Sequence, residues 1–62
     1  MKNEVLRTFE IVNKDGTTTA IYDNLFDAFA AIVVGDSIVM VIETTKVDEF
    51  KTIQTVEKTR VF

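Results

Sequence analysis

The 62-residue sequence contains no cysteine, no histidine and no proline. Without cysteine, no disulfide can stabilise a core that so short a chain makes only marginally stable. Without cysteine or histidine, the usual zinc sites cannot be assembled, and an enzyme would lack its commonest general base and its strongest nucleophile. We therefore expect no catalytic residue, no metal site and no cofactor, and we interpret the chain as non-enzymatic.

The remaining candidates for site chemistry have simpler explanations. Ser37 lies in a predicted helix-to-strand turn and has no base beside it in the sequence. The carboxylate pair Asp23/Asp27 is typical of a helix start, and the pair Asp48/Glu49 is typical of a solvated turn. None of these residues is predicted to act as a catalytic acid, base or nucleophile.

Length and composition indicate a single domain over residues 1–62 that associates with itself. A chain of this size buries only about 60% of the surface that its unfolded form exposes. Hydrophobic residues make up 47% of the sequence, which is more than a domain of this size can bury. An exposed apolar patch usually marks an interface. We therefore predict a homo-oligomer, most simply a dimer.

Charge and hydropathy restrict the other classes of partner. The formal net charge of −3 opposes attraction to phosphates, so nucleic acid is not the expected partner. The longest nearly apolar stretch, residues 28–34, is far shorter than the ~20 residues of a membrane span. The first residues also lack the pattern of a secretory signal. We expect a cytoplasmic protein that does not contact the membrane.

The first third of the sequence predicts a β-hairpin. Apolar residues recur at a period of two over residues 4–13, as in a strand, and residues 17–22 are rich in β-branched side chains. Between them, Asp15 and Gly16 are suited to the left-handed backbone of a tight turn. The turn is therefore predicted at residues 13–16.

The pattern then changes to that of a helix over residues 25–34. Asp23 and Asn24 are good N-cap residues. The apolar side chains of the segment recur at helical spacing, and Gly35 suits a left-handed residue at the end of a helix. One face of this helix is expected to lie on the sheet.

Residues 37–45 predict another strand, in which residues 38–42 are apolar on both sides. Such a run is typical of a central strand that is covered on both faces. Because one short helix can cover only one face, we predict that a second copy covers the other. The predicted interface residues are Ile38, Val39, Met40, Val41 and Ile42.

Residues 51–62 allow two interpretations. Val47, Phe50 and Ile53 recur at three-residue spacing, which indicates a short helix, but the segment is rich in threonine, which loses rotamer freedom in a helix. We therefore predict a second hairpin with its turn near residues 47–49. The predicted fold class is α+β: a small, mainly antiparallel four-stranded sheet in the order β-β-α-β-β, with one helix packed on one face.

By elimination, the expected function is binding to another protein. One alternative is a monomer whose C-terminal segment covers the second sheet face. Another is a nucleic-acid-binding domain that uses basic and aromatic side chains of the C-terminal hairpin, although interleaved acidic residues argue against it. The residues concerned are Lys46, Lys51, Lys58, Arg60, Phe50 and Phe62.

Short acidic α/β chains without cysteine or histidine are common among phage and mobile-element proteins that bind and inhibit a host enzyme. The likeness is one of size and charge, and no motif supports it. On this likeness we hypothesise that the chain regulates or inhibits an unidentified protein partner. The acidic residues that would face such a partner are Asp23, Asp27, Asp36, Asp48 and Glu49.

Overall fold

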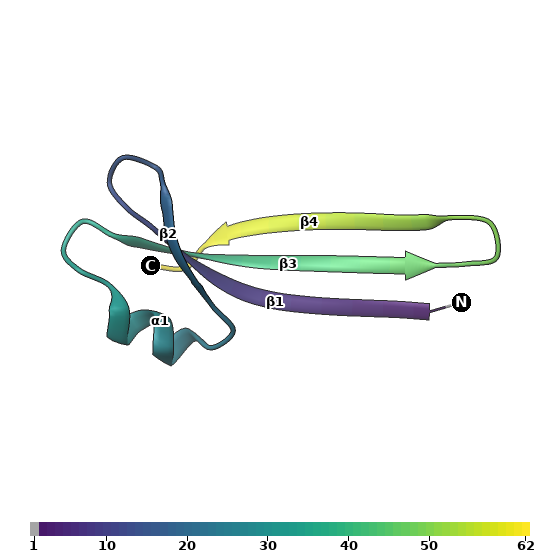
Figure 1. Cartoon of the computed structure of the whole chain (residues 1–62), viewed down its shortest axis with the longest axis horizontal. Helices are drawn as coiled ribbons and strands as arrows, with labels where there is room; N and C mark the ends of the chain where they lie inside the picture. The colour runs from purple at the N-terminus through teal and green to yellow at the C-terminus, as the bar shows by residue number, and fades with distance from the viewer. Residues whose placement is uncertain (1) are drawn as a thin grey trace.

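The computed structural model describes residues 2–62, which form four strands and one helix (Figure 1). In chain order the elements are β1 (Lys2–Val12), β2 (Thr18–Tyr22), α1 (Leu25–Ala31), β3 (Ser37–Val47) and β4 (Thr52–Arg60). The predicted order β-β-α-β-β and the predicted antiparallel pairing are confirmed. The C-terminal segment is a strand, so the helical alternative for it is wrong.

The strands form one sheet in the order β2-β1-β3-β4. The two central strands, β1 and β3, pair along their full length, from Lys2 opposite Val47 to Val12 opposite Ser37. β2 and β4 pair with the outer sides of β1 and β3. α1 connects β2 to β3 and so carries the chain past β1 to the other side of that strand.

Local chemistry explains the first turn and the start of the helix. The Asn13 side chain accepts hydrogen bonds from the backbone N–H groups of Asp15 and Thr17, at 3.0 and 2.9 Å, and Gly16 has the positive φ of 86° that favours glycine. Asn24 is the N-cap, and its side chain accepts the N–H of Phe26 at 2.7 Å.

The helix ends at Ala31, three residues before the predicted end at residue 34. Ile32 already has an extended backbone (φ −74°, ψ 152°), in keeping with the weak helix propensity of β-branched residues. Gly35, with φ 97°, does not end the helix. It lies in a separate turn in which Asp36 N–H donates to the Val33 carbonyl at 3.0 Å.

The core lies at one end of the sheet, beneath the helix. We call the side on which α1 packs the helix face, and the other side the far face. On the helix face, Phe9, Ile11 and Ile38 form a buried cluster with Ala28 of the helix. The small Ala28 side chain lets the helix approach the strands closely, and it is itself fully buried.

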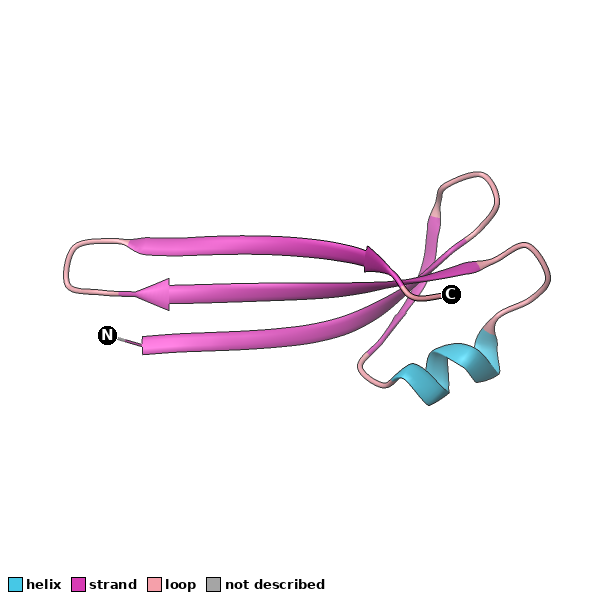
Figure 2. Cartoon of the chain, turned by 180° about the vertical axis from the view of Figure 1, so that it is seen from behind, coloured by secondary structure: helices cyan, strands magenta, loops and turns pink. Residues whose placement is uncertain are grey.

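The rest of the sheet extends away from this core, so the molecule is elongated (Figures 1 and 2). Its extents are 47 × 22 × 15 Å and its radius of gyration is 14.1 Å, against about 11 Å for a compact domain of this length. We divide it into a head, which holds α1, β2 and the core, and an arm. The arm comprises residues 2–8 of β1, 41–47 of β3 and 52–58 of β4, together with the turn that joins β3 to β4.

Candidate functional site

The arm is a three-stranded sheet with an open edge on each side. β2 pairs only with the part of β1 from Phe9 to Val12, so within the described residues 2–62 no strand pairs with the outer edge of residues 2–8. The outer edge of β4 is likewise free of a strand partner in this part of the chain. Rows of free backbone donors and acceptors on such edges are templates for pairing with another chain.

Apolar side chains are exposed along the arm. Val5 and Leu6 of β1 are 68% and 56% exposed. Ile53 and Val56 of β4 and Val47 of β3 are exposed as well. A shallow hollow of about 490 Å³ lies on the far face of the arm over β1 and β3, lined by Glu4, Val5, Leu6, Glu43 and Thr45.

Neither face of the arm is apolar as a whole. The register places Val5, Thr44 and Thr55 in one row across the helix face. On the far face the corresponding row is Leu6, Glu43 and Val56. A sheet that packs face to face normally concentrates its apolar residues on one side, so the mixed faces favour contact through the edges.

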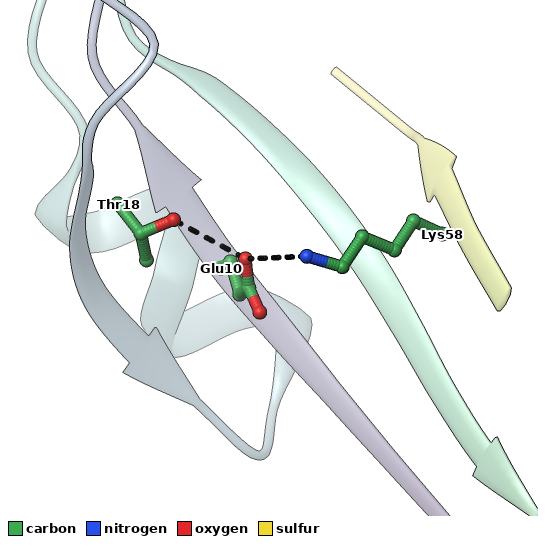
Figure 3. Close-up of polar contacts among 3 residues, drawn as sticks. All are labelled: Glu10, Thr18 and Lys58. Atoms are coloured by element: carbon green, nitrogen blue, oxygen red, sulfur yellow. Dashed lines mark hydrogen bonds and ion pairs between the residues drawn. The ribbon is translucent and has the colours of Figure 1, made fainter. Parts of the chain in front are cut away.

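Where the head meets the arm, the far face carries a polar bridge that crosses β3 (Figure 3). The Nζ of Lys58, on β4, lies 3.8 Å from Oε1 of Glu10, on β1. The Thr18 hydroxyl, on β2, donates to the same carboxylate oxygen at 3.3 Å. Val41 stands directly opposite Lys58 in the register and is only 2% exposed. The Lys58 stem therefore supplies cover for the second face of β3, as long basic side chains do elsewhere.

The apolar run at residues 38–42 is thus largely covered within a single chain. Ile38 is buried under the helix and Val41 is buried on the far face, so neither presents a side chain to a second copy. Val39, Met40 and Ile42 are half-buried and keep some exposed surface. The arm exposes more apolar surface than this run does, and Val5 and Leu6, which the sequence does not single out, contribute to it.

A mismatch of strand lengths in the sequence signals this site. The first predicted strand spans residues 4–13, but its hairpin partner spans only residues 17–22. Once the turn is fixed at residues 13–16, the beginning of the first strand extends past the end of the second. The N-terminal part of β1 therefore needs another neighbour or remains an open edge.

The five acidic residues singled out in the sequence are not brought together. Asp23 and Asp27 lie at the start of α1, whereas Asp48 and Glu49 lie in the turn at the far end of the arm (Figure 1). The Asp36 carboxylate accepts the N–H of Val33 at 3.1 Å and so stabilises the turn in which it lies. These positions do not form one acidic surface.

Asp48 has a structural role in the turn between β3 and β4. Its Oδ1 accepts the backbone N–H groups of Phe50 and Lys51, at 2.8 and 2.9 Å. These two hydrogen bonds, first from Phe50 and then from Lys51, hold the pKa of the Asp48 carboxyl below its usual value. The carboxylate form is therefore the form that stabilises the turn.

Replacing Asp48 by alanine is expected to lower the urea midpoint of unfolding at neutral pH, while Glu49→Ala leaves it unchanged. Because the folded-state pKa of Asp48 is depressed, its contribution is present above the usual carboxyl pKa and is lost as the pH falls through the lowered value. Urea titrations at pH 7 and pH 2 should show the difference between wild type and Asp48→Ala shrink in acid. A difference that persists at pH 2 would contradict this role.

The basic residues of the C-terminal hairpin are also separated. Lys46 lies on the helix face of β3, whereas Lys58 and Arg60 lie on the far face of β4. Lys58 is paired with Glu10, and the Arg60 Nε donates to the Phe62 carbonyl at 3.1 Å. They therefore do not form one continuous basic strip for a nucleic-acid strand.

Aromatic side chains mark the two ends of the molecule. Phe50 is exposed in the turn of the arm. At the head, the rings of Phe29 and Phe62 meet edge to face with their centroids 4.9 Å apart. Val33 and Val34, in the loop beside them, are exposed.

Among residues 2–62, no three acidic side chains gather closely enough to hold a metal ion. No helix in the same residues is both long enough and apolar enough to cross a membrane. Comparison with protein-family models, with curated proteins and with solved structures finds no match to this chain, so the geometry of the arm is what bears on function.

Proposed function

We propose that the chain is a non-enzymatic cytoplasmic protein that acts through protein–protein contacts as a homo-oligomer, most simply a dimer. The observation that carries the proposal is the arm: three strands with two open edges and exposed apolar side chains that lie outside the core. Open edges that bear apolar residues make a protein that works as a monomer prone to aggregation. In an assembling protein they are the contact surface.

The exposed area supports the same proposal. The single chain exposes 4786 Å², whereas size scaling gives about 4,000 Å² for a compact monomer of this mass. The excess is roughly 750 Å², close to the ~800 Å² that each partner buries in a standard protein–protein interface. One contact along the arm would bring the surface per chain to the value of an ordinary folded protein.

Edge pairing fits the arm better than packing of its faces. Face packing would bury Glu43 on one side and Lys46 or Glu57 on the other, each a charge that needs a partner when it is removed from water. Edge pairing satisfies backbone groups and leaves these side chains in solvent. Affinity then comes from main-chain hydrogen bonds, and the flanking side chains set the specificity.

The test is the mass in solution. At tens of micromolar, light scattering is expected to give twice the chain mass of 7.0 kDa, and the mass should fall on dilution. The urea midpoint should also rise with protein concentration, because association stabilises the folded chain by mass action. A mass of one chain across this range, with a midpoint that does not depend on concentration, would remove the basis for the proposed function.

A further inference from the structure

We infer that a second copy of this chain pairs antiparallel with residues 2–8 of β1, with Val5 opposite Val5 of the second copy. The inference rests on the proposed self-association and specifies its contact. The resulting assembly would have a continuous sheet that runs through both arms, with a two-fold axis between the paired β1 strands. Four observations fix the edge and the register.

The first observation is the direction of the backbone groups. In antiparallel sheets, alternate residues direct both N–H and C=O to the same neighbouring strand. Asn13 N–H donates to the Thr17 carbonyl, and the Ile11 carbonyl accepts the Thr19 hydroxyl, so odd-numbered residues of β1 face the β2 side. By the same alternation, Asn3, Val5 and Arg7 direct their backbone groups to the open edge.

The second observation is that β2 limits how far a partner strand can advance. Tyr22 stands opposite Phe9 and occupies that position on the β1 edge. A register centred on Leu6 would place Asn3 of the second copy opposite Phe9, where Tyr22 already lies. Val5 is therefore the residue nearest to β2 on which the pairing can be centred while residues 2–8 of both copies pair.

The third observation is charge. A register centred one residue earlier, on Glu4, would put two carboxylates directly opposite each other, which is destabilising. Centring on Val5 pairs Glu4 with Leu6 and Lys2 with Thr8, so no like charges are opposed. It also matches Asn3 with Arg7, so that all three outward-facing residues of each strand exchange hydrogen bonds.

The fourth observation is the surface where the partner strand would end. In this register Lys2 of the second copy lies opposite Thr8, next to the end of β2, where Asp23 follows. Asp23 is exposed at this point. A lysine beside an exposed aspartate gives opposite charges at each end of the paired segment, and two-fold symmetry repeats the contact.

The open edge of β4 lacks such a limit. Its residues Thr52–Arg60 can self-pair about Thr55 or about Val56 without opposing like charges, and no neighbouring strand stops either register. An edge that allows several registers is weakly specified. On the β1 edge only the register centred on Val5 pairs all of residues 2–8, and this edge carries the two most exposed apolar side chains of the arm strands.

Proline at Val5 tests the contact, and proline at Val56 is the matched control. Val5→Pro removes an N–H from the open edge of β1, and Val56→Pro removes one from the open edge of β4. Both spare the ladders with β3, because the N–H lost faces outward and edge positions tolerate proline. Val5→Pro removes two hydrogen bonds per dimer and is expected to raise the dissociation constant by at least about tenfold. Val56→Pro is expected to leave it unchanged, as measured by sedimentation, with circular dichroism to confirm folding.

A cysteine at Val5 tests the register and does not depend on the proline variant folding. The chain has no cysteine of its own, so a disulfide reports only the introduced position. Opposed residues of an antiparallel pair lie within the Cα separation that a disulfide spans. Val5→Cys is expected to form a covalent dimer rapidly under mild oxidation, whereas Val56→Cys should do so much more slowly.

The outcomes separate this inference from the proposed function. A wild-type monomer would overturn both. A wild-type dimer that is weakened by Val56→Pro and not by Val5→Pro would assign the contact to β4 and overturn the inference alone. A dimer that neither proline affects, or a Val5→Cys variant that cross-links no faster than Val56→Cys, would overturn it as well.

Discussion

Replacing Ile38 by alanine is expected to destabilise the folded chain by about 2–5 kcal/mol, the usual cost of emptying a fully buried aliphatic site. Ile38 is 0% exposed and packs in the cluster with Phe9, Ile11 and Ala28. A domain of this length has roughly 3–9 kcal/mol of stability in total. The variant should therefore lose most of its cooperative urea transition. Far-ultraviolet circular dichroism at one fixed, low protein concentration measures that transition.

Ile21→Ala is the matched control for Ile38→Ala. Ile21 is the same residue type in a strand, but it is 61% exposed and lies on the far face of β2, away from the helix. Its free energy of unfolding should change by less than about 0.5 kcal/mol, as for most surface substitutions. Equal losses of unfolding free energy from the two substitutions would contradict the placement of Ile38 in the core and of Ile21 at the surface.

The order of the elements was predictable because short-range chemistry decides it. Gly16 has the predicted left-handed backbone in the first hairpin turn, whereas Asp15 does not; the Asn13 side chain completes that turn. Asn24 supplies the N-cap of the helix, and each of these groups acts within a few residues along the chain. The second hairpin followed from its threonine content and from Asp48 at the turn. These signals need no knowledge of the tertiary structure.

The end of the helix was not predictable from the same rules. Val33 and Val34 continue the apolar pattern, so the sequence favoured a helix to residue 34. In the folded chain this segment extends so that β3 can begin at Ser37 next to β1, on the side away from β2. The position of β3 is a tertiary requirement, and it outweighs a weak local preference.

The location of the exposed apolar surface was missed for a similar reason. The run at residues 38–42 is apolar on both sides, yet α1 covers it at Ile38 and the Lys58 side chain, sixteen positions or more away in the sequence, crosses its far face (Figure 3). Conversely, Val5 and Leu6 look unremarkable in the sequence. Their exposure results from β2 being shorter than β1, which is a property of strand pairing.

Replacing Val41 by alanine is expected to cost about 2 kcal/mol, because the side chain is buried on the far face although no helix lies there. The register flanks Val41 with Thr8 and Lys58, and the Lys58 side chain reaches over β3 toward Glu10 (Figure 3). The Lys58 side chain is 60% exposed and the Glu10 side chain 16%, and at 3.8 Å their ion pair contributes less than about 1 kcal/mol. The cover, and so the loss in the variant, comes from the aliphatic stem.

Val56→Ala separates burial from strand propensity in this experiment. Val56 lies on the same far face and is 52% exposed, so both substitutions lose the β-propensity of valine but only Val41→Ala empties a buried site. Lys58→Met should keep most of the wild-type stability because it keeps the stem, whereas Lys58→Ala should approach the loss seen for Val41→Ala. If Val41→Ala and Val56→Ala shifted the urea midpoint equally, Val41 would not be covered within one chain. The second face of β3 would then need a second copy to cover it.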